Sequence, residues 1–129
     1  MAQKLPVYLE GKTKPYRGDG RKLGYPTANI DSLVSLSDGI FFGFASLGPY
    51  KNQPALIFIG TPLTTGDTIR RVEAHLLDVA DINYYDQQLV LDVRYFHRPN
   101  QKFDSVNELL NAIKQDEASA RNWFVGKEK

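Results

Sequence analysis

Residues 18–30, GDGRKLGYPTANI, combine residue types that can hold phosphate. The glycines allow close approach to the backbone, and a pair of cations supplies positive charge. Pro26 fixes a turn, after which Thr27 and Asn29 can face the same way because they are two residues apart. The residues concerned are Gly18, Gly20, Arg21, Lys22, Gly24, Pro26, Thr27 and Asn29. Such a loop suits an oligophosphate ligand.

Glu73 interrupts the apolar stretch VEAHLL at residues 72–77. Burial raises the pKa of a carboxyl group unless a partner stabilises its charge, and such a poised carboxyl group suits a general base. In the structural alternative, Glu73 pairs with Arg70, Arg71 or Arg94 across the sheet, while the polar residues of the PTAN turn cap that turn. Taken alone, the residues favour this alternative.

Other chemistry-bearing motifs fit less well. The GKT at residues 11–13 lacks the first glycine of a P-loop, since Pro6 stands at that position. The glycines of 18–24 lack the spacing of a dinucleotide-binding fold. His75 and His97 have no acidic or cysteine companions at ligand spacing, so we expect packing or hydrogen-bonding roles rather than metal binding.

Composition limits the classes of protein that fit this chain. Its 129 residues suit one domain over 1–129, with 42% apolar and 24% charged residues. Cysteine is absent and the formal net charge is +1, which excludes thiolate chemistry and argues against nucleic acid as a partner. No apolar run approaches the roughly 20 residues of a membrane span, and residues 1–22 lack the apolar core of a signal peptide. We therefore expect a cytoplasmic protein without nucleic acid or membrane partners, and we expect it to be a monomer.

Apolar runs of strand length occupy most of the chain up to residue 98. They lie at residues 6–12, 39–47, 55–61, 68–77 and 89–97, separated by turn-rich stretches at 48–54, 62–67 and 78–88. The short connections favour antiparallel neighbours. Period-2 alternation predicts two sets of residues that share a face, Val72, Ala74 and Leu76, and Leu91, Val93 and Tyr95.

The end of the chain changes to helical spacing. Ser105 and Glu108 form a capping box, and apolar residues then recur every three or four positions. This pattern predicts an amphipathic helix over 106–124, with the KQDE segment at 114–117 facing solvent. A curled sheet needs its open face covered. We therefore predict a mainly β fold, a Greek-key-like barrel of about six antiparallel strands, five of which are located above, with a C-terminal α-helix packed on it.

Five segments of the chain carry a family resemblance in the right order, at residues 18–30, 38–47, 54–60, 72–78 and 94–120. Together they resemble the riboflavin kinase family, which also forms the C-terminal module of bifunctional bacterial FAD synthetases. The Leu-Gly-aromatic-Pro-Thr-Ala-Asn block at 23–29 is highly specific to that family. The Val-Glu-x-His-Leu-Leu strand, the Arg-Pro turn and the Ser-x-x-Glu-Leu helix start corroborate it, and the likeness covers residues 11–121. The family's fold is a six-stranded antiparallel barrel with a C-terminal helix, which agrees with the elements above.

The resemblance implies a reaction and a role for the matching residues. Riboflavin kinases transfer the γ-phosphoryl group of ATP to the ribityl 5′-hydroxyl of riboflavin, giving FMN and ADP. Thr27 and Asn29 would hold Mg²⁺ and the nucleotide phosphates, and Glu73 would accept the hydroxyl proton. The glycines and cations of 18–24 would approach and neutralise the phosphates. Flavin contacts are expected from Tyr85, Arg98 and Phe103.

The chain departs from the family pattern near the expected flavin site. It has Tyr84-Tyr85-Asp86 where the family usually has Leu-Tyr-Gly, and Arg98-Pro99-Asn100 where it usually has Arg-Pro-Glu. It also lacks the usual Asn-Pro-x-Phe after IGT at 59–61. The glycine position favours a positive φ, which Asp tolerates better than most residues.

Two alternatives to a kinase stay open. One is a weakly active or non-catalytic flavin-nucleotide-binding module on the same barrel, which the altered flavin loops would allow. The other is a barrel that binds protein or single-stranded nucleic acid, for which the aromatic residues and the basic stretch at 12–22 are the support. Tyr84 and Tyr85 fit either a loop anchor or a platform for a planar ligand.

Overall fold

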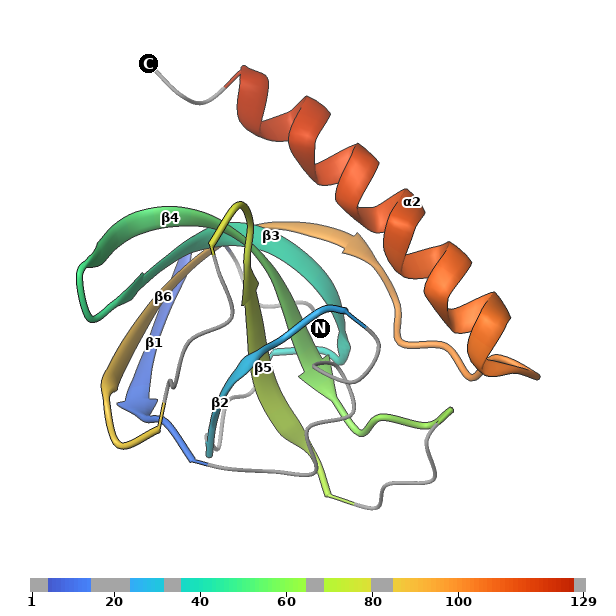
Figure 1. Ribbon diagram of the computed structural model, residues 1–129, viewed down its shortest axis with the longest axis horizontal. Coiled ribbons are helices and arrows are strands. Elements are labelled where there is room, and N and C mark those ends of the chain that lie inside the picture. The colour runs from blue at the N-terminus through green and yellow to red at the C-terminus, as the bar shows by residue number, and fades with distance from the viewer. Residues whose placement is uncertain (1–4, 15–23, 32–35, 65–68, 80–84, 127–129) are drawn as a thin grey trace.

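The computed structural model describes residues 5–14, 24–31, 36–64, 69–79 and 85–126. Its strands are β1 (Val7–Lys12), β2 (Ala28–Ile30), β3 (Gly39–Leu47), β4 (Tyr50–Gly60), β5 (Arg71–Leu76) and β6 (Gln88–Arg98), and its helix is α2 (Val106–Val125). Figure 1 shows the helix lying over one side of the curled strands. The mainly β fold with a C-terminal helix confirms the prediction.

The six strands form one antiparallel sheet that curls into a half-barrel (Figure 1). Their order is β1-β6-β3-β4-β5-β2, so β6 returns to lie beside β3 after the run β3-β4-β5. That arrangement is a Greek key. The two edge strands meet at one end, where the Lys14 amide just after β1 donates to the Asn29 carbonyl of β2 at 2.9 Å. This bond connects the first strand to the motif at residues 27–29.

Alternate residues of the strands fill the inside of the curl. Removing their apolar surface from water is the main force that holds the sheet in this shape. On β5, the predicted face of Val72, Ala74 and Leu76 lies in this core. Glu73 and His75 lie on the opposite face of the same strand and are half-buried. One strand therefore supplies both core packing and polar groups.

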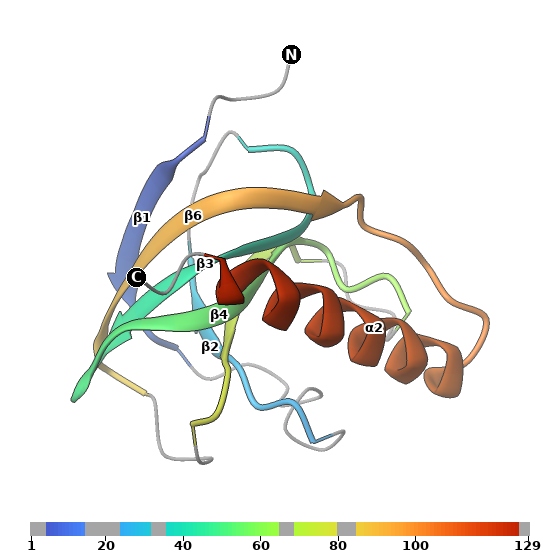
Figure 2. The ribbon, with the colours of Figure 1, turned by 90° about the horizontal axis from the view of Figure 1, so that it is seen from above.

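The helix α2 packs on the outer face of β3 and β4 (Figure 2). Ala120 and Phe124 of the helix join Phe42 of β3 and Leu56 of β4 in a second apolar cluster. The predicted N-cap is confirmed, since the hydroxyl of the residue before α2 accepts the Glu108 amide at 3.1 Å. Among the described residues, no helix combines the length and apolarity needed to cross a bilayer.

The strand β5, Arg71–Leu76, is shorter than the expected 68–77. Two larger differences from the sequence expectation concern β4 and β2. The strand β4 begins at Tyr50 rather than at residue 55, because Gly48, with φ +55°, permits a tight turn directly after β3. The strand β2 has three residues, Ala28–Ile30, and was not located from the sequence. Three residues are too few to show a period of two, so its assignment depends on pairing with β5.

A bulge in β6 changes the face that Tyr95 occupies. Val93 and Tyr95 pair with the adjacent residues Gly43 and Phe42, so Arg94 is the extra residue. Tyr95 consequently stacks on Phe42, with 5.6 Å between the ring centroids. The prediction that Tyr95 shares the face of Val93 is wrong, because a period of two holds only while each strand residue has one partner.

Candidate active site

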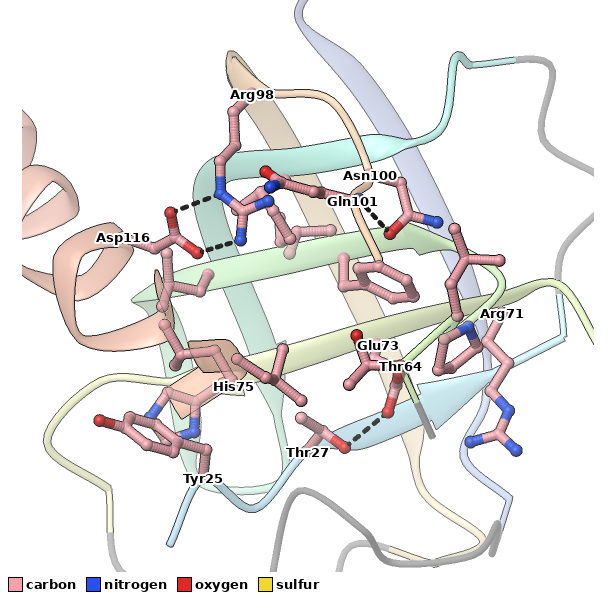
Figure 3. Close-up of a pocket in the computed structure, with 18 of the residues that line it drawn as sticks. Tyr25, Thr27, Thr64, Arg71, Glu73, His75, Arg98, Asn100, Gln101 and Asp116 are labelled. Carbon is pink, nitrogen blue, oxygen red and sulfur yellow. Dashed lines mark hydrogen bonds and ion pairs between the residues drawn. The ribbon is translucent and has the colours of Figure 1, made fainter. Parts of the chain in front are cut away.

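A pocket of about 180 Å³ opens between the half-barrel and α2 (Figure 3). Strands β2, β5 and β6, together with the residues just before β2 and just after β6, supply most of its polar side chains. Strands β3 and β4 and the helix α2 supply most of its apolar ones. The polar residues include Tyr25, Thr27, Asn29, Arg71, Glu73, His75, Arg98, Asn100 and Asp116, and the apolar ones include Ile40, Leu56, Phe58, Leu63, Leu109 and Ile113. The pocket therefore offers a polar side and an apolar wall to one ligand.

Thr27 and Glu73 meet on the polar side of this pocket (Figure 3). Asn29 of β2 pairs in register with Glu73 of β5, and side chains on one face of paired strands lie close together. The Thr27 hydroxyl donates a hydrogen bond to Glu73 Oε1 at 3.0 Å. The Asn29 Nδ2 donates to the Thr27 carbonyl at 3.3 Å and to the Thr27 hydroxyl oxygen at 3.4 Å. The three side chains thus form one hydrogen-bonded group.

The oxygen atoms of this group suit a hard divalent cation. Asn29 is only 7% exposed, and within the described residues its buried Oδ1 accepts no hydrogen bond. A buried acceptor without a partner costs free energy, which a bound cation or water would recover. Amide and hydroxyl oxygens are ligands that Mg²⁺ accepts beside waters and phosphate oxygens. Asn29 and Thr27 therefore have the oxygen donors that a magnesium ion requires.

His75 and Tyr25 lie beside the turn at Pro26. His75 follows Glu73 by two positions, and its Nδ1 lies 2.8 Å from the Pro26 carbonyl oxygen. The Tyr25 ring packs edge-on against the imidazole, with 5.4 Å between centroids. Burial, and secondarily the charge of Glu117, raises the pKa of the Tyr25 hydroxyl above its usual value. The expected hydrogen-bonding role of His75 is confirmed.

The carboxylate of Asp116 is buried between α2 and β6 (Figure 3). Arg98 donates to it twice, from Nε to Oδ1 at 2.8 Å and from Nη2 to Oδ2 at 2.7 Å, and His97 Nε2 lies 3.2 Å from Oδ1. The expectation that residues 114–117 face solvent is wrong for Asp116. Its position, three residues after Ile113, falls in the apolar stripe of the helix. This helical spacing is the sequence feature that could have predicted a buried carboxylate, because a charged residue in an apolar stripe is buried only when it is paired.

The remaining predicted site residues are dispersed. Gly24 adopts φ +90°, a conformation that favours glycine. Outside the described residues lie Gly18, Gly20, Arg21 and Lys22. Arg98 lines the pocket, and its Cζ lies 5.7 Å from the centroid of the Phe103 ring. Tyr85 precedes β6, at the opposite end of that strand from Arg98, and is not among the residues that line the pocket.

Two of the arginines considered as partners of Glu73 bond to other carboxylates. Arg70 donates to Asp38 at 2.8 Å, and Arg94 donates to Asp92 at 2.7 Å. Both acceptors belong to the part of the chain that the structure describes. Arg71 lines the same pocket as Glu73, so the pairing of Glu73 with an arginine stays an open alternative.

The structure shows how two departures from the family pattern are accommodated by their surroundings. Asp86 adopts φ +58° at the position where the family usually has glycine, as the sequence led us to expect. Asn100, at the position where the family usually has Glu, donates from Nδ2 to the Thr61 carbonyl at 2.9 Å. This bond ties the segment after β6 to the end of β4, so the substitution supports the rim of the pocket.

Comparison with known proteins identifies the family. A family model, described as Flavokinase: Riboflavin kinase, matches residues 3–124. The chain belongs to the riboflavin kinase family. This match confirms the resemblance that the sequence motifs indicated, and it covers both the half-barrel and nearly all of α2.

Relatives and a solved structure agree with this assignment. The chain is 31% identical to the riboflavin kinase of Homo sapiens, over 91% of this chain and 80% of that protein. It is 36% identical to the bifunctional riboflavin kinase/FMN adenylyltransferase of Escherichia coli (strain K12), over 92% of this chain and 38% of the relative, so it spans well under half of that protein. The riboflavin kinase structure from Trypanosoma brucei matches with a TM-score of 0.68 at 21% identity, over 90% of this chain and 75% of that one, which supports the fold.

Proposed function

We propose that this chain is a riboflavin kinase that transfers the γ-phosphoryl group of ATP to the 5′-hydroxyl of riboflavin, giving FMN and ADP. The observation that carries the proposal is the 3.0 Å hydrogen bond from Thr27 to Glu73 inside the pocket. It joins an oxygen suited to a nucleotide-bound cation to a carboxylate that can accept a proton. Membership of the riboflavin kinase family supports the same reaction.

The two parts of riboflavin match the two sides of the pocket. The tricyclic isoalloxazine ring suits the apolar wall, while the hydroxylated ribityl chain suits the polar side that holds Glu73. The proposed wall for the ring consists of Ile40, Leu56, Phe58, Leu109 and Ile113. Arg98, in the same pocket, and Phe103 beside it are proposed flavin contacts. Tyr85 stays a prediction as a third contact.

Thr27 and Asn29 are proposed to hold Mg·ATP. When bound, Mg²⁺ neutralises charge on the phosphate oxygens. Asn29 Oδ1 and Thr27 Oγ1 are the proposed protein ligands, because both are uncharged oxygens and Oδ1 is buried without a hydrogen-bond partner within the described residues. The Thr27 hydroxyl oxygen has lone pairs for a cation while its O–H group donates to Glu73. The phosphate contacts of residues 18–24 stay predictions.

Glu73 is proposed to act as the general base. It accepts the proton of the 5′-hydroxyl while the alcohol oxygen forms a bond to the γ-phosphorus. The bond between that phosphorus and the β–γ bridging oxygen breaks, and ADP leaves with the electron pair. The proton then passes from Glu73 to solvent. Few side chains need to react, because most of the rate of phosphoryl transfer comes from alignment and charge neutralisation.

Incubation of the purified protein with riboflavin and Mg·ATP tests this proposal. FMN and ADP should form in equal amounts, as measured by chromatography. Lumiflavin, which has the same ring system without a ribityl chain, is the matched control and should give neither product. Riboflavin binding without FMN would contradict the kinase and support the non-catalytic flavin-binding module. ADP without FMN would also contradict it, since phosphate would have passed to water.

A further inference from the structure

His75 lines the pocket beside Glu73, yet the proposed reaction gives it no role. Both side chains project from the same face of β5, because they are two residues apart on one strand. The Nδ1 atom of His75 lies 2.8 Å from the carbonyl oxygen of Pro26. A carbonyl oxygen can only accept a hydrogen bond, so Nδ1 is the protonated ring nitrogen that donates. The hydrogen bond therefore assigns the tautomer of His75.

This bond continues the link between β2 and β5 beyond the end of their backbone pairing. The pairing runs from Ile30 with Val72 to Ala28 with Ala74 and stops there. Pro26 lies two residues before Ala28 and has no backbone N–H, so it cannot donate a backbone hydrogen bond to β5. Its carbonyl oxygen instead accepts a hydrogen bond from the imidazole of His75.

Tyr25 holds the imidazole from another direction. Its ring contacts the His75 ring edge-on, at an interplanar angle of 70° and a centroid distance of 5.4 Å. Such pairs favour one ring orientation, because the positive edge of one ring meets the negative face of the other. The orientation of the Nδ1–H group toward Pro26 is therefore fixed by both a hydrogen bond and a packing contact.

The Pro26 carbonyl and the nitrogen of Thr27 belong to one planar peptide group. A bond that fixes this plane also fixes the positions of the Thr27 nitrogen and Cα, and so restricts where the Thr27 side chain can lie. The Thr27 hydroxyl is the group that donates to Glu73 Oε1 at 3.0 Å. A rotation of the plane would lengthen that bond, and displacements on the order of 1 Å at a reacting site can cost about 10²-fold in rate.

We propose that His75 is a positioning residue, whose Nδ1–H holds the Pro26–Thr27 peptide so that Thr27 stays aligned with Glu73 and with the nucleotide phosphates. The inference rests on the proposed kinase function. His75 acts through Pro26 and Thr27 and not on the substrates. The apolar wall proposed for the isoalloxazine ring comes from β3, β4 and α2, so the inference also predicts that riboflavin binding depends on His75 less than the use of Mg·ATP does.

Two amide variants of His75 test whether a hydrogen-bond donor is needed at the place of Nδ1 or whether any polar side chain is enough. In His75→Asn the amide nitrogen can occupy the place of Nδ1, whereas in His75→Gln the amide lies one bond further out. We expect His75→Gln to lower kcat and raise the KM for Mg·ATP, by roughly 10- to 100-fold in kcat/KM, as for other groups that orient site residues. His75→Asn should recover most of this loss. The KM for riboflavin should change less than the KM for Mg·ATP in both variants.

Binding and spectroscopy test the inference without turnover. Calorimetry with Mg·ADP should show weaker binding to His75→Gln than to His75→Asn. Nitrogen-15 NMR of the unmodified protein should show the proton of neutral His75 on Nδ1, and this measurement does not depend on whether any variant folds. A proton on Nε2 would overturn the inference, as would equal kinetics and equal Mg·ADP affinities for both variants. Suppose that the wild-type protein formed no FMN, but the Nδ1 proton and the difference in Mg·ADP affinity were both observed. The kinase proposal alone would then fail.

Discussion

The hydroxyl group of Thr27 connects the two sides of the proposed reaction. It donates to the carboxylate of Glu73 at 3.0 Å, and its oxygen lies 3.4 Å from the Asn29 amide nitrogen. Proton acceptance is assigned to Glu73 and nucleotide binding to Thr27 and Asn29. Because the two tasks lie on different side chains, substitutions should affect them separately.

Glu73→Gln isolates proton acceptance. Glutamine has nearly the same volume, and its amide oxygen can still accept the hydrogen bond of Thr27, but it cannot take up a proton. We expect kcat to fall on the order of 10²-fold or more, the usual share of a positioned general base. Mg·ADP affinity, measured by calorimetry, should change much less. A variant with a near-wild-type rate of FMN formation would show that Glu73 is not the base.

Thr27→Val and Thr27→Ser isolate the hydroxyl. Valine keeps the branched shape and removes the oxygen, whereas serine keeps the oxygen and removes a methyl group. Thr27→Val should raise the KM for Mg·ATP by roughly tenfold or more, as expected for loss of a metal ligand or its orientation. Thr27→Ser should stay close to the wild type. Initial rates over a series of Mg·ATP concentrations test this, and similar KM values for both variants would contradict a role for the hydroxyl.

At the scale of elements, β3 depends on a close approach between strands. It lies between β4 and β6 in the sheet. A Cβ at Gly43 would lie 2.1 Å from the Asp92 carbonyl oxygen and 3.0 Å from Ile57 Cδ1. Backbone atoms cannot yield as a side-chain end can, so any side chain at Gly43 would force the strands apart.

Gly43→Ala should therefore lower the free energy of unfolding by about 1–3 kcal/mol or more, the range for overpacking. Gly126→Ala is the matched control. Its Cβ would meet nothing nearer than the Trp123 carbonyl oxygen at 3.8 Å, and its φ of −80° suits any residue. Urea unfolding of the two variants should show a loss for the first and none for the second. Equal stabilities would show that β3 can shift to accommodate the methyl group.

The attachment of α2 depends on a buried ion pair. Asp116→Ala leaves the Arg98 guanidinium without its bidentate partner. We expect a loss of about 3 kcal/mol in unfolding free energy, near the low end for breaking a buried pair, because the Arg98 side chain is 21% exposed. Asp78→Asn, which removes the charge of the exposed pair with Arg121 and keeps a residue that tolerates φ +61°, should cost less than about 1 kcal/mol. Urea unfolding distinguishes them, and the reverse order would contradict this account.

Across the whole molecule, the pocket collects residues from β2, β5, β6 and α2, which lie far apart in the sequence. The sequence motifs predicted Thr27, Asn29 and Glu73 as site residues one at a time. Their approach depends on the register of β2 with β5, which no local pattern encodes. Asp116 was missed because it follows Lys114 and Gln115 in a polar run, although its helical position is apolar.

Long elements with clear sequence boundaries were the most predictable parts of the fold. The strand β3 matches its expected bounds of 39–47, because it is a continuous apolar run between turn residues. The helix α2 extends one residue beyond the expected 106–124, because it keeps one helical period over many residues. The strand β2 is too short for this, and the bulge at Arg94 interrupts β6. Local patterns therefore gave the architecture, while pairing across the sheet determines how the pocket is assembled.

Because the pocket forms only when these segments are folded together, its ligands should stabilise the whole molecule. At 100 times its Kd, Mg·ADP should add about 2.7 kcal/mol to the free energy of unfolding, by mass action on the folded state. EDTA should remove most of this gain, since Asn29 Oδ1 and Thr27 Oγ1 are proposed to bind the nucleotide through the cation. Riboflavin should stabilise equally with or without EDTA, because its proposed wall is apolar. Urea unfolding with each ligand, with and without EDTA, tests both expectations, and nucleotide stabilisation that is insensitive to EDTA would contradict the assigned magnesium site.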